Sequence, residues 1–337
     1  MPTIRDVAKE ANVSIATVSR ILNNDKNYRA SAETRRRVFA AADNLHYSPN
    51  PSYVKKKNEN GHIAAINNLT TERQQDSYYS AILTSARNYL SAYGYSLDFV
   101  LSQHEISDPA ILNGVIKNKI RGLILLTTPT HDVFQTLRKN IPHIVGVNTR
   151  NYEIDNARYN TFEAGTQAMR FLIEQGHSRI AFIGGFLPNG YTYNMERYDA
   201  YRIAMRMHDF AIEPGWIIDC RWDRQICFSE TQKLIDSPHR PTAFFVSSDN
   251  MAMACMSAIT QKGLKIPDDV SVIGISDVPE SRYLTPALTT VAIPQKDLGE
   301  VVAQVLIQRI EGDKTAIKQI YVPTHLVERD SLKKMQT

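Results

Sequence analysis

The sequence has few cysteines and no long apolar run. It holds three cysteines in 337 residues, Cys220, Cys227 and Cys255, with no Cys-x-x-Cys pair and no Cys/His ligand spacing. An odd number of scattered cysteines predicts neither a disulfide framework nor a zinc site, so packing is the expected role of all three. No stretch approaches the roughly twenty apolar residues of a membrane-spanning helix. The first residues, MPTIRDVAKE, also lack the apolar core of a signal peptide, and we therefore expect a cytoplasmic protein without membrane association.

The chain also lacks the short motifs of common enzyme and cofactor sites. GxGxxG, the phosphate loop GxxxxGKS/T, GxSxG and HExxH are all absent. We therefore predict no enzymatic activity, no cofactor and no metal site. Two carboxylates acting as acid and base would escape such a search, but Asp249 and Asp277 have a sufficient role as acceptors for ligand hydroxyls.

Positive charge is concentrated near the N-terminus. Residues 1–60 hold eleven Lys/Arg and six Asp/Glu, whereas the rest of the chain holds 28 and 29. Such an asymmetry is typical of a segment that binds nucleic-acid phosphates, although a solvated tail has the same composition. The length of the chain predicts a small domain followed by a larger one with two lobes.

Apolar periodicity predicts three short helices in the basic segment. The first has its apolar residues at spacings of three and four: Ile4, Val7, Ala8 and Ala11. Asn12 follows where a tight turn needs a residue that tolerates positive φ, and Ser14 offers its hydroxyl to the next helix. That second helix is expected to end near Leu22, and a third is expected to begin at Ser31.

Beyond the helices the composition changes twice. The segment SPNPSYVKKKNENG is rich in proline, lysine and polar residues and indicates a connector. Short β-rich runs then alternate with helical patterns, which predicts parallel sheets. We therefore expect an all-α helix-turn-helix headpiece at 1–48, a hinge at 49–61 and a two-lobed α/β domain with parallel sheets at 62–337. Its N-lobe should span about 62–160 and its C-lobe about 161–290, with crossovers near 290–325.

The second helix has the features of a DNA-recognition helix. Its outward first turn is small and polar, so Arg20 can donate two hydrogen bonds to a guanine while Ile15 and Ala16 contact a thymine methyl. An ordinary surface helical hairpin is the alternative, but the localised basic charge and the following connector favour DNA binding. Further cations would contact phosphates: Arg5, Arg35, Arg36, Arg37, Lys55, Lys56 and Lys57.

These residues closely resemble the LacI/GalR family of bacterial repressors. The pattern DVAxxAxVSxxTVSRxLN is followed by Thr34, Arg35, Val38, Leu45, Tyr47, Pro49 and Asn50 in the family's order. The segments IEQGHSRIAFIGG, SSDNMA and DDVSVIGISD extend the resemblance through the large domain, which implies an α/β two-lobed fold like that of periplasmic binding proteins. ILNND, DSYYSAI and ISDVPESRY are most similar to the evolved β-galactosidase repressor type within the family.

The resemblance implies a homodimer that places two headpieces in successive major grooves of a palindromic operator. The predicted DNA-binding residues are Thr3, Ser14, Ile15, Ala16, Thr17, Ser19, Arg20, Asn23, Tyr47, Asn50, Tyr53, Lys55 and Lys56. Family members also wedge a leucine into the minor groove, and Lys56 stands at that position here. Because a charged ammonium is costly to desolvate between base pairs, we predict a weaker or different kink, with Tyr53 or Val54 as the remaining apolar candidates.

Polar residues at predicted strand ends form the candidate effector site, since ligands of parallel sheets bind at the carboxyl ends of strands. They are Asp76, Tyr78, Tyr79, Asn148, Arg197, Trp222, Ser248, Asp249, Ser276 and Asp277. The resemblance implies that Arg197 is the family's effector arginine and Trp222 its stacking aromatic. It also matches Asp249 and Ser276–Asp277 to late acidic positions. Core packing for the aromatics and a surface salt bridge for Arg197 are the alternatives.

Together these features predict a sequence-specific repressor of carbohydrate utilisation genes that a small sugar controls allosterically, with a galactoside favoured. A ligand that closes the lobes would change DNA affinity only through its preference for one lobe arrangement. Two alternatives stay open: a regulator with a purine or another non-sugar effector, and a sugar-binding protein that does not bind DNA. Thr161, where many family members carry Asp, indicates that the contacts to ligand hydroxyls differ here.

Overall fold

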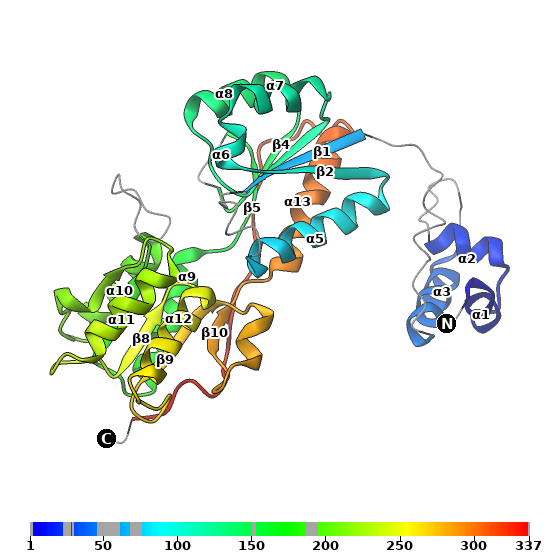
Figure 1. Cartoon of the computed structure of the whole chain (residues 1–337). Coiled ribbons are helices and arrows are strands. Elements are labelled where there is room, and N and C mark those ends of the chain that lie inside the picture. Colours follow the sequence, from blue (N-terminus) through cyan, green and yellow to red (C-terminus); the bar gives the residue numbers. More distant parts are fainter. Residues whose placement is uncertain are drawn as a thin grey trace. The chain divides into compact units, whose positions relative to one another are not determined.

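The computed structural model describes residues 3–22, 28, 30–45, 61–67, 76–149, 153–185 and 195–335. Contacts divide the chain into two units, Met1–Glu59 and Asn60–Thr337 (Figure 1). The described part of the first unit is all-helical, and the second unit is built on two sheets. None of the described helices is long and apolar enough to cross a bilayer.

The N-terminal unit packs three helices around one apolar core. They are α1 (Ile4–Glu10), α2 (Ile15–Leu22) and α3 (Ala32–Asn44). The core residues are Val7, Ala8, Ala11, Val18, Ile21, Val38, Ala41 and Ala42. The predicted headpiece architecture is confirmed.

Local side-chain chemistry sets the limits of these helices. Asn12 has a φ of 50°, so the turn between α1 and α2 does use the left-handed region, as predicted. Ser14 Oγ accepts a hydrogen bond from the backbone N of Thr17 at 3.0 Å and caps α2. Ser31 caps α3 in the same way through the backbone N of Thr34, at 3.1 Å.

The N-lobe of the large unit is a six-stranded sheet in the order β11-β5-β4-β3-β1-β2, in which every strand pair is parallel. Its strands are β1 (Gly61–Asn67), β2 (Tyr95–Ser102), β3 (Gly122–Leu125), β4 (Ile144–Val147), β5 (Asp155–Arg158) and β11 (Gln319–Tyr321). Its helices are α5 (Ser77–Ala92), α6 (Gln103–Ile106), α7 (Pro109–Lys117), α8 (His131–Asn140) and α13 (Gln295–Ile310). α5 and α13 cover one face of the sheet, and α6, α7 and α8 cover the other (Figure 1).

The C-lobe is a second six-stranded sheet, in the order β12-β10-β9-β8-β6-β7. Its strands are β6 (Ile180–Gly184), β7 (Ile217–Asp219), β8 (Ala243–Val246), β9 (Ser271–Ser276), β10 (Thr289–Ala292) and β12 (His325–Val327). Its helices are α9 (Thr161–Glu174), α10 (Met195–Met207), α11 (Arg224–Ile235) and α12 (Asp249–Gln261), with 3-10 turns η2 (Pro214–Trp216) and η3 (Pro279–Tyr283). The central strands are buried along their whole length, as expected of a parallel sheet covered by helices on both faces.

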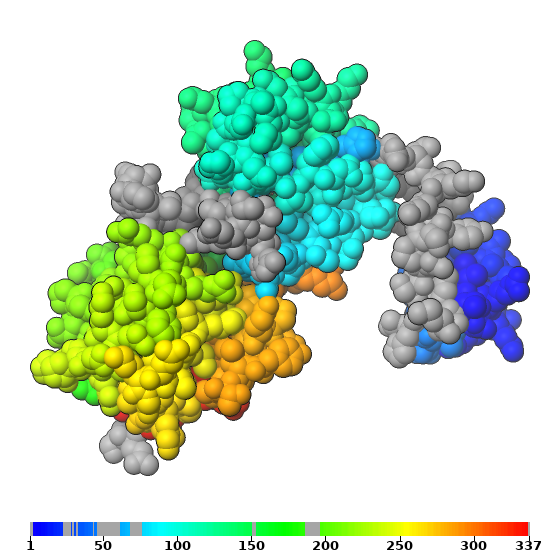
Figure 2. Space-filling model, viewed as in Figure 1, coloured from blue at the N-terminus to red at the C-terminus, as the bar shows by residue number. Residues whose placement is uncertain are grey.

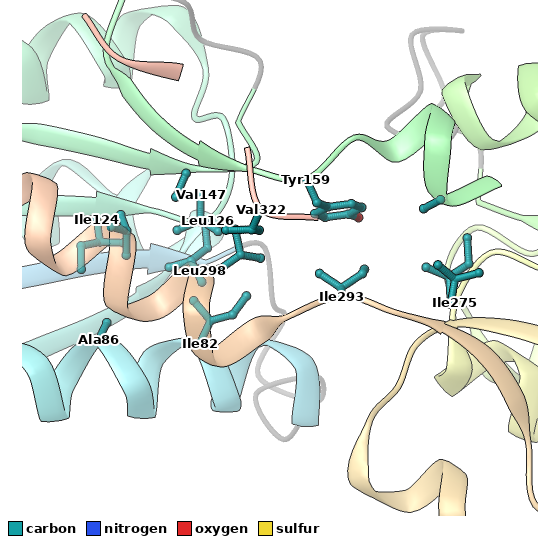
Figure 3. Packing of buried hydrophobic residues seen from close by; sticks show 14 of the residues in the cluster. Ile82, Ala86, Ile124, Leu126, Val147, Tyr159, Ile275, Ile293, Leu298 and Val322 are labelled. Carbon is teal, nitrogen blue, oxygen red and sulfur yellow. The ribbon is translucent and has the colours of Figure 1, made fainter. Parts of the chain in front are cut away.

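The chain passes between the lobes three times, after β5, after β10 and after β11. Each of these strands ends at the carboxyl edge of a parallel sheet, so the three crossovers join the two carboxyl edges. Tyr159 and Ile293 lie at two of the crossovers, between Val322 and Leu298 of the N-lobe side and Ile275 of the C-lobe (Figure 3). Their burial continues one apolar core from lobe to lobe.

β12 differs from the purely parallel sheets that the sequence predicts, because it pairs antiparallel with β10. The crossover geometry explains the difference. β11 leaves the N-lobe at its carboxyl edge, so the chain enters the C-lobe sheet at its carboxyl edge and must run against the other strands. Figure 2 shows the resulting C-lobe surface in green, yellow and orange.

Candidate functional site

The exposed side of α2 carries the residues predicted to read DNA. Ser14, Ile15, Ala16 and Arg20 are exposed, and Ile15 keeps 44% of its surface accessible. An apolar side chain on the first turn of a solvated helix gains nothing from water, but it suits a thymine methyl in the major groove. The guanidinium of Arg20 lies 5.2 Å from the centre of the Tyr28 ring. This cation–π contact helps to hold the arginine side chain on the exposed side of α2.

Other predicted DNA contacts have local partners within the headpiece. Thr17 Oγ1 hydrogen-bonds with Ser14 Oγ at 2.9 Å and with the Tyr28 hydroxyl at 3.1 Å. Thr3 donates its backbone N–H to the carboxylate of Asp6 at 2.7 Å, at the start of α1. Ser19 is half-buried. The predicted residues Asn23, Tyr47, Asn50, Tyr53, Lys55 and Lys56 lie outside the described residues.

The predicted effector residue Arg197 lies at the centre of a cluster between the lobes. Its side chain is only 7% exposed although it carries a full charge. Nη1 donates to the backbone O of Ser247, at the end of β8, at 2.7 Å, and Nη2 donates to the Tyr159 hydroxyl at the crossover after β5. The guanidinium carbon also lies 5.9 Å from the centre of the Tyr159 ring. The carboxyl edges of both sheets therefore meet at Arg197.

The beginning of α5 brings the N-lobe to this cluster. Burial raises the pKa of Tyr78 well above its usual value, and the neighbouring Tyr159 hydroxyl adds to the effect. Tyr79 packs edge-on against Tyr78, with ring centres 5.1 Å apart. Tyr78 thus lies near Arg197, whereas Tyr79 supports Tyr78 from the side.

Asp76 and Ser77 contact the C-lobe directly. The Asp76 side chain caps α5 by accepting from the backbone N of Tyr78 at 3.0 Å and also hydrogen-bonds with Asn250 of α12. Burial raises the pKa of its carboxyl. Ser77 Oγ donates to Glu280 of η3. These bonds join the beginning of α5 to the C-lobe beside the Arg197 cluster.

Trp222 lies over the end of β6. A Cβ added to Gly185 would overlap Cδ1 of the Trp222 ring, so only glycine allows the ring to approach this closely. Trp222 itself has a φ of 59° and is half-buried. Asn148, Ser276 and Asp277 also have positive φ, at 50°, 139° and 53°. Non-glycine residues rarely adopt these conformations, and they concentrate at functional sites.

The carboxylates of the C-lobe have partners within that lobe. Asp249 is 0% exposed and accepts three hydrogen bonds, from Val278 N at 3.1 Å, Ser281 Oγ at 2.7 Å and Thr290 Oγ1 at 2.6 Å. Burial raises the pKa of its carboxyl to about 6. This geometry favours a structural role for Asp249 over the predicted effector contact, because no surface of the side chain is open to a ligand.

Asp277 and Ser248 are also engaged. The Asp277 carboxylate pairs with Nη2 of Arg329 at 2.5 Å and lies 4.0 Å from Nη2 of Arg282. Ser248 Oγ caps α12 by accepting from the backbone N of Met251 at 3.4 Å. Both therefore hold loops and helices at the carboxyl edge in place.

Sequence reasoning missed four residues of the cluster: Tyr159, Ser247, Asn250 and Glu280. Tyr159 directly follows β5, so the rule that selected the other strand ends would have found it. Ser247 takes part through its backbone oxygen, which no side-chain pattern reveals. Among the described residues, no group of three His, Cys, Asp or Glu side chains could hold a metal ion.

Comparison with known proteins places the two units in one family. Residues 3–50 match the model of bacterial regulatory proteins of the lacI family, and residues 169–332 match the periplasmic binding protein-like domain. The HTH-type transcriptional repressor PurR of Escherichia coli O139:H28 (strain E24377A / ETEC) is 33% identical, over 98% of this chain and 97% of its own. The chain belongs to the lacI family. It is a DNA-binding transcriptional repressor, and its relatives are regulators and not enzymes, as predicted.

Solved structures of lacI-family proteins share the fold. The transcriptional regulator CelR in complex with cellobiose has a TM-score of 0.72 and 24% identity, over 98% of this chain and 100% of CelR. The lac repressor dimer bound to operator and the anti-inducer ONPF has a TM-score of 0.69 and 24% identity, over 98% and 99%. At this identity the likeness shows the fold alone, and the similarity to the β-galactosidase repressor type stays a prediction.

Proposed function

We propose that this lacI-family repressor binds palindromic operator DNA as a homodimer and that a small sugar bound between the lobes controls its affinity for that DNA. A galactoside is the sugar we favour, and genes of carbohydrate utilisation are the proposed targets. We assign DNA binding to residues 1–48, the hinge to 49–61, and effector binding and dimerisation to 62–337.

The observation that carries the proposal is the buried Arg197 cluster. Arg197 bonds to Ser247 on the C-lobe and to Tyr159 at a crossover, with Tyr78 of the N-lobe beside them. A sugar presents hydroxyls and an apolar ring face, and the cluster offers a guanidinium with aromatic rings around it. A ligand that bonds to Arg197 would therefore interact with both lobes, which is the differential contact that allosteric control requires.

A homodimer is supported by an open groove on the N-lobe. It lies along α5 and α13 and holds about 660 Å³. Its lining combines small side chains of α5, among them Ser80, Ala81 and Thr84, with the larger Tyr89, Lys296 and Glu300. Small residues let a helix of a second copy approach closely. The lac repressor structure of the same fold is described as a dimer bound to operator.

The proposal is tested by fluorescence anisotropy of a labelled palindromic duplex, at fixed salt, with and without candidate effectors. The panel contains galactosides, cellobiose and ribose, together with purines for the alternative effector class, since the PurR relative keeps that class open. We expect sequence-selective binding that one sugar changes. If only a purine changes DNA binding, the effector is a purine and not a sugar. If the protein binds no duplex selectively, the proposal is contradicted.

Arg197→Ala should abolish the effector response and leave operator binding intact, because it removes the guanidinium that bonds to Ser247 of the C-lobe and to Tyr159 at the crossover and that we assign to the effector. A charge-assisted hydrogen bond between an effector hydroxyl and this guanidinium contributes about 1.5–3 kcal/mol, so effector affinity should fall by at least about tenfold. Arg206→Ala, an exposed arginine on the same helix, is the matched control and should respond as the wild type does. A full effector response in the Arg197→Ala variant would show that Arg197 is not part of the effector site.

The hinge prediction is kept as a proposal, since Lys56 lies outside the described residues. We propose that Lys56→Leu increases the bend of the operator, because leucine can insert between base pairs and an ammonium cannot. Gel mobility of circularly permuted operator fragments measures the bend angle. An equal bend in the wild type and the variant would show that another residue forms the wedge.

A further inference from the structure

A basic loop lies at the amino edge of the N-lobe sheet. Between α7 and β3 the chain places three cations within five residues, Lys117, Lys119 and Arg121, and all three side chains are exposed. β3 pairs parallel with β1, so the loop lies beside the beginning of β1. This α7–β3 patch is at the opposite edge of the sheet from the crossovers and the Arg197 cluster.

The patch is tied to the point where the chain enters the large unit. The backbone N of Arg121 donates to the backbone O of His62 at 2.9 Å. A Cβ added to Gly61 would overlap Cδ of Arg121, so the arginine side chain passes directly over the first residue of β1. Gly61 has a φ of 127°, a conformation that other residues rarely adopt. Arg121 therefore lies against the first residues of β1, and Lys117 and Lys119 precede it in the chain.

The charge of the patch is local. Beyond residue 60 the chain holds 28 Lys/Arg and 29 Asp/Glu, so the large unit as a whole has no basic excess. Within the described ranges, Lys117 and Lys119 form no ion pair with an acidic side chain. Two acidic residues lie near the start of β1. Asp98 pairs with His62 and accepts from Ser96 Oγ at 2.8 Å. Burial raises the pKa of Tyr95, which pairs with Gly61, and the charges of Arg121 and Glu311 both act on that pKa.

The length of the connector sets how far the headpiece can lie from this patch. Residues 46–60 join the last described residue of the headpiece to Gly61, and at roughly 3.5 Å per residue they span at most about 50 Å. DNA is stiff over such lengths, since its persistence length is about 50 nm, so it continues past the headpiece as a straight, highly charged rod. The length of the connector therefore allows exposed cations at the start of β1 to reach phosphates of the same duplex.

We propose that Lys117, Lys119 and Arg121 contact phosphates of the operator DNA, in addition to the contacts of the headpiece. The inference rests on the proposed operator binding. These contacts strengthen binding without reading sequence, because phosphates are the same at every base pair. They also make part of the affinity depend on the large unit, so a change between its lobes can act on DNA directly as well as through the hinge.

The test is operator binding by the full chain carrying Lys117→Gln, Lys119→Gln and Arg121→Gln, measured by anisotropy between about 50 and about 200 mM salt. Each lost phosphate contact should lower the slope of log affinity against log salt by about 0.9. Over this salt range one contact accounts for about a 3-fold change in affinity. The preference for operator over random DNA should be unchanged, and effector binding should be retained.

The double variant Lys117→Gln/Lys119→Gln keeps Arg121 at the start of β1 and decides the outcome if the triple variant does not fold. The matched control replaces three exposed lysines of the C-lobe, Lys233, Lys262 and Lys265, with glutamine and should keep the wild-type slope. A wild-type salt slope in the double variant, or an equal loss of slope in the control, would contradict phosphate binding by the patch. If the wild type itself binds no duplex selectively, the proposed function fails, and the inference fails with it.

Discussion

The two lobes have sheets of the same strand order but use the polar residues at their carboxyl edges differently. In the C-lobe, Asp249 and Asp277 are bonded to partners of their own lobe. In the N-lobe, Asp76 and Ser77 begin α5 and extend to Asn250 and Glu280 of the other lobe. The polar residues at the C-lobe edge thus bond within their own lobe, whereas those at the beginning of α5 bond to the other lobe.

This difference shows that a polar residue at a strand end has two possible roles. It can stabilise its own lobe, or it can contact the opposite lobe or a ligand. Substitutions on the two sides should therefore act on different measurements: stability for the first kind, and effector response for the second.

The largest effect is expected from Asp249→Asn. The amide presents N–H groups where Val278 N, Ser281 Oγ and Thr290 Oγ1 now donate to the carboxyl oxygens, so a buried donor loses its acceptor. We expect a loss of about 2–3 kcal/mol in the free energy of unfolding, measured by urea denaturation at about pH 4, where the folded-state carboxyl is protonated. Unchanged stability would contradict the structural role of Asp249.

The pH dependence of that loss gives a second readout. Burial raises the folded-state pKa of Asp249 to about 6, above its ordinary value of 3.8. The stabilisation from this group is therefore full below about pH 4 and is lost as the pH rises through 6. The difference in unfolding free energy between wild type and Asp249→Asn should change by up to about 3 kcal/mol across this window. A constant difference would show that the carboxyl does not titrate there.

Gly185→Ala should have an intermediate effect, on effector binding more than on stability. The added methyl overlaps the Trp222 ring and forces it away from the end of β6. We expect effector affinity to fall by about tenfold, which corresponds to about 1.4 kcal/mol. Isothermal titration with the effector measures the change. Gly215→Ala, where an added methyl meets no neighbour, is the control and should bind as the wild type does.

The smallest effect is expected from Ser77→Ala. It removes one hydrogen bond between the lobes, to Glu280, at a cost of about 0.5–1.5 kcal/mol in the arrangement that contains it. Apparent effector affinity should therefore change by up to about tenfold while the unfolding midpoint stays within error. Ser91→Ala, exposed near the end of α5, is the control. An equal change in both variants would mean that the Ser77 bond does not couple the lobes.

Much of the fold could be predicted because its signals are local. Asn12, Ser14 and Ser31 act on residues within one helical turn, and the apolar spacing of α1 to α3 directly gives the headpiece core. The alternation of buried strands and helices likewise predicted two parallel sheets. The antiparallel β12 was missed, since its direction depends on which edge of the C-lobe the chain enters.

The effector cluster could be predicted only in part. Position at a strand end selected Tyr78 and Arg197, which the structure does bring together. The same rule selected Asp249 and Asp277, whose partners lie between 5 and 52 residues away and satisfy them within the C-lobe. Whether a carboxylate is open or already bonded depends on those distant partners, and no local pattern records them.

The sequence by itself determined the three-helix headpiece and the alternating strands and helices of two lobes, because caps, turns and apolar periodicity act over a few residues. The family followed from the resemblance of its longer motifs to those of known repressors. Only the tertiary structure decided which polar residues face the other lobe. Arg197 meets Tyr159 and Ser247 from positions 38 and 50 residues away, at edges that three crossovers bring together. Such contacts arise from how whole sheets are joined, and this is the reason that the chain's local chemistry could not specify them.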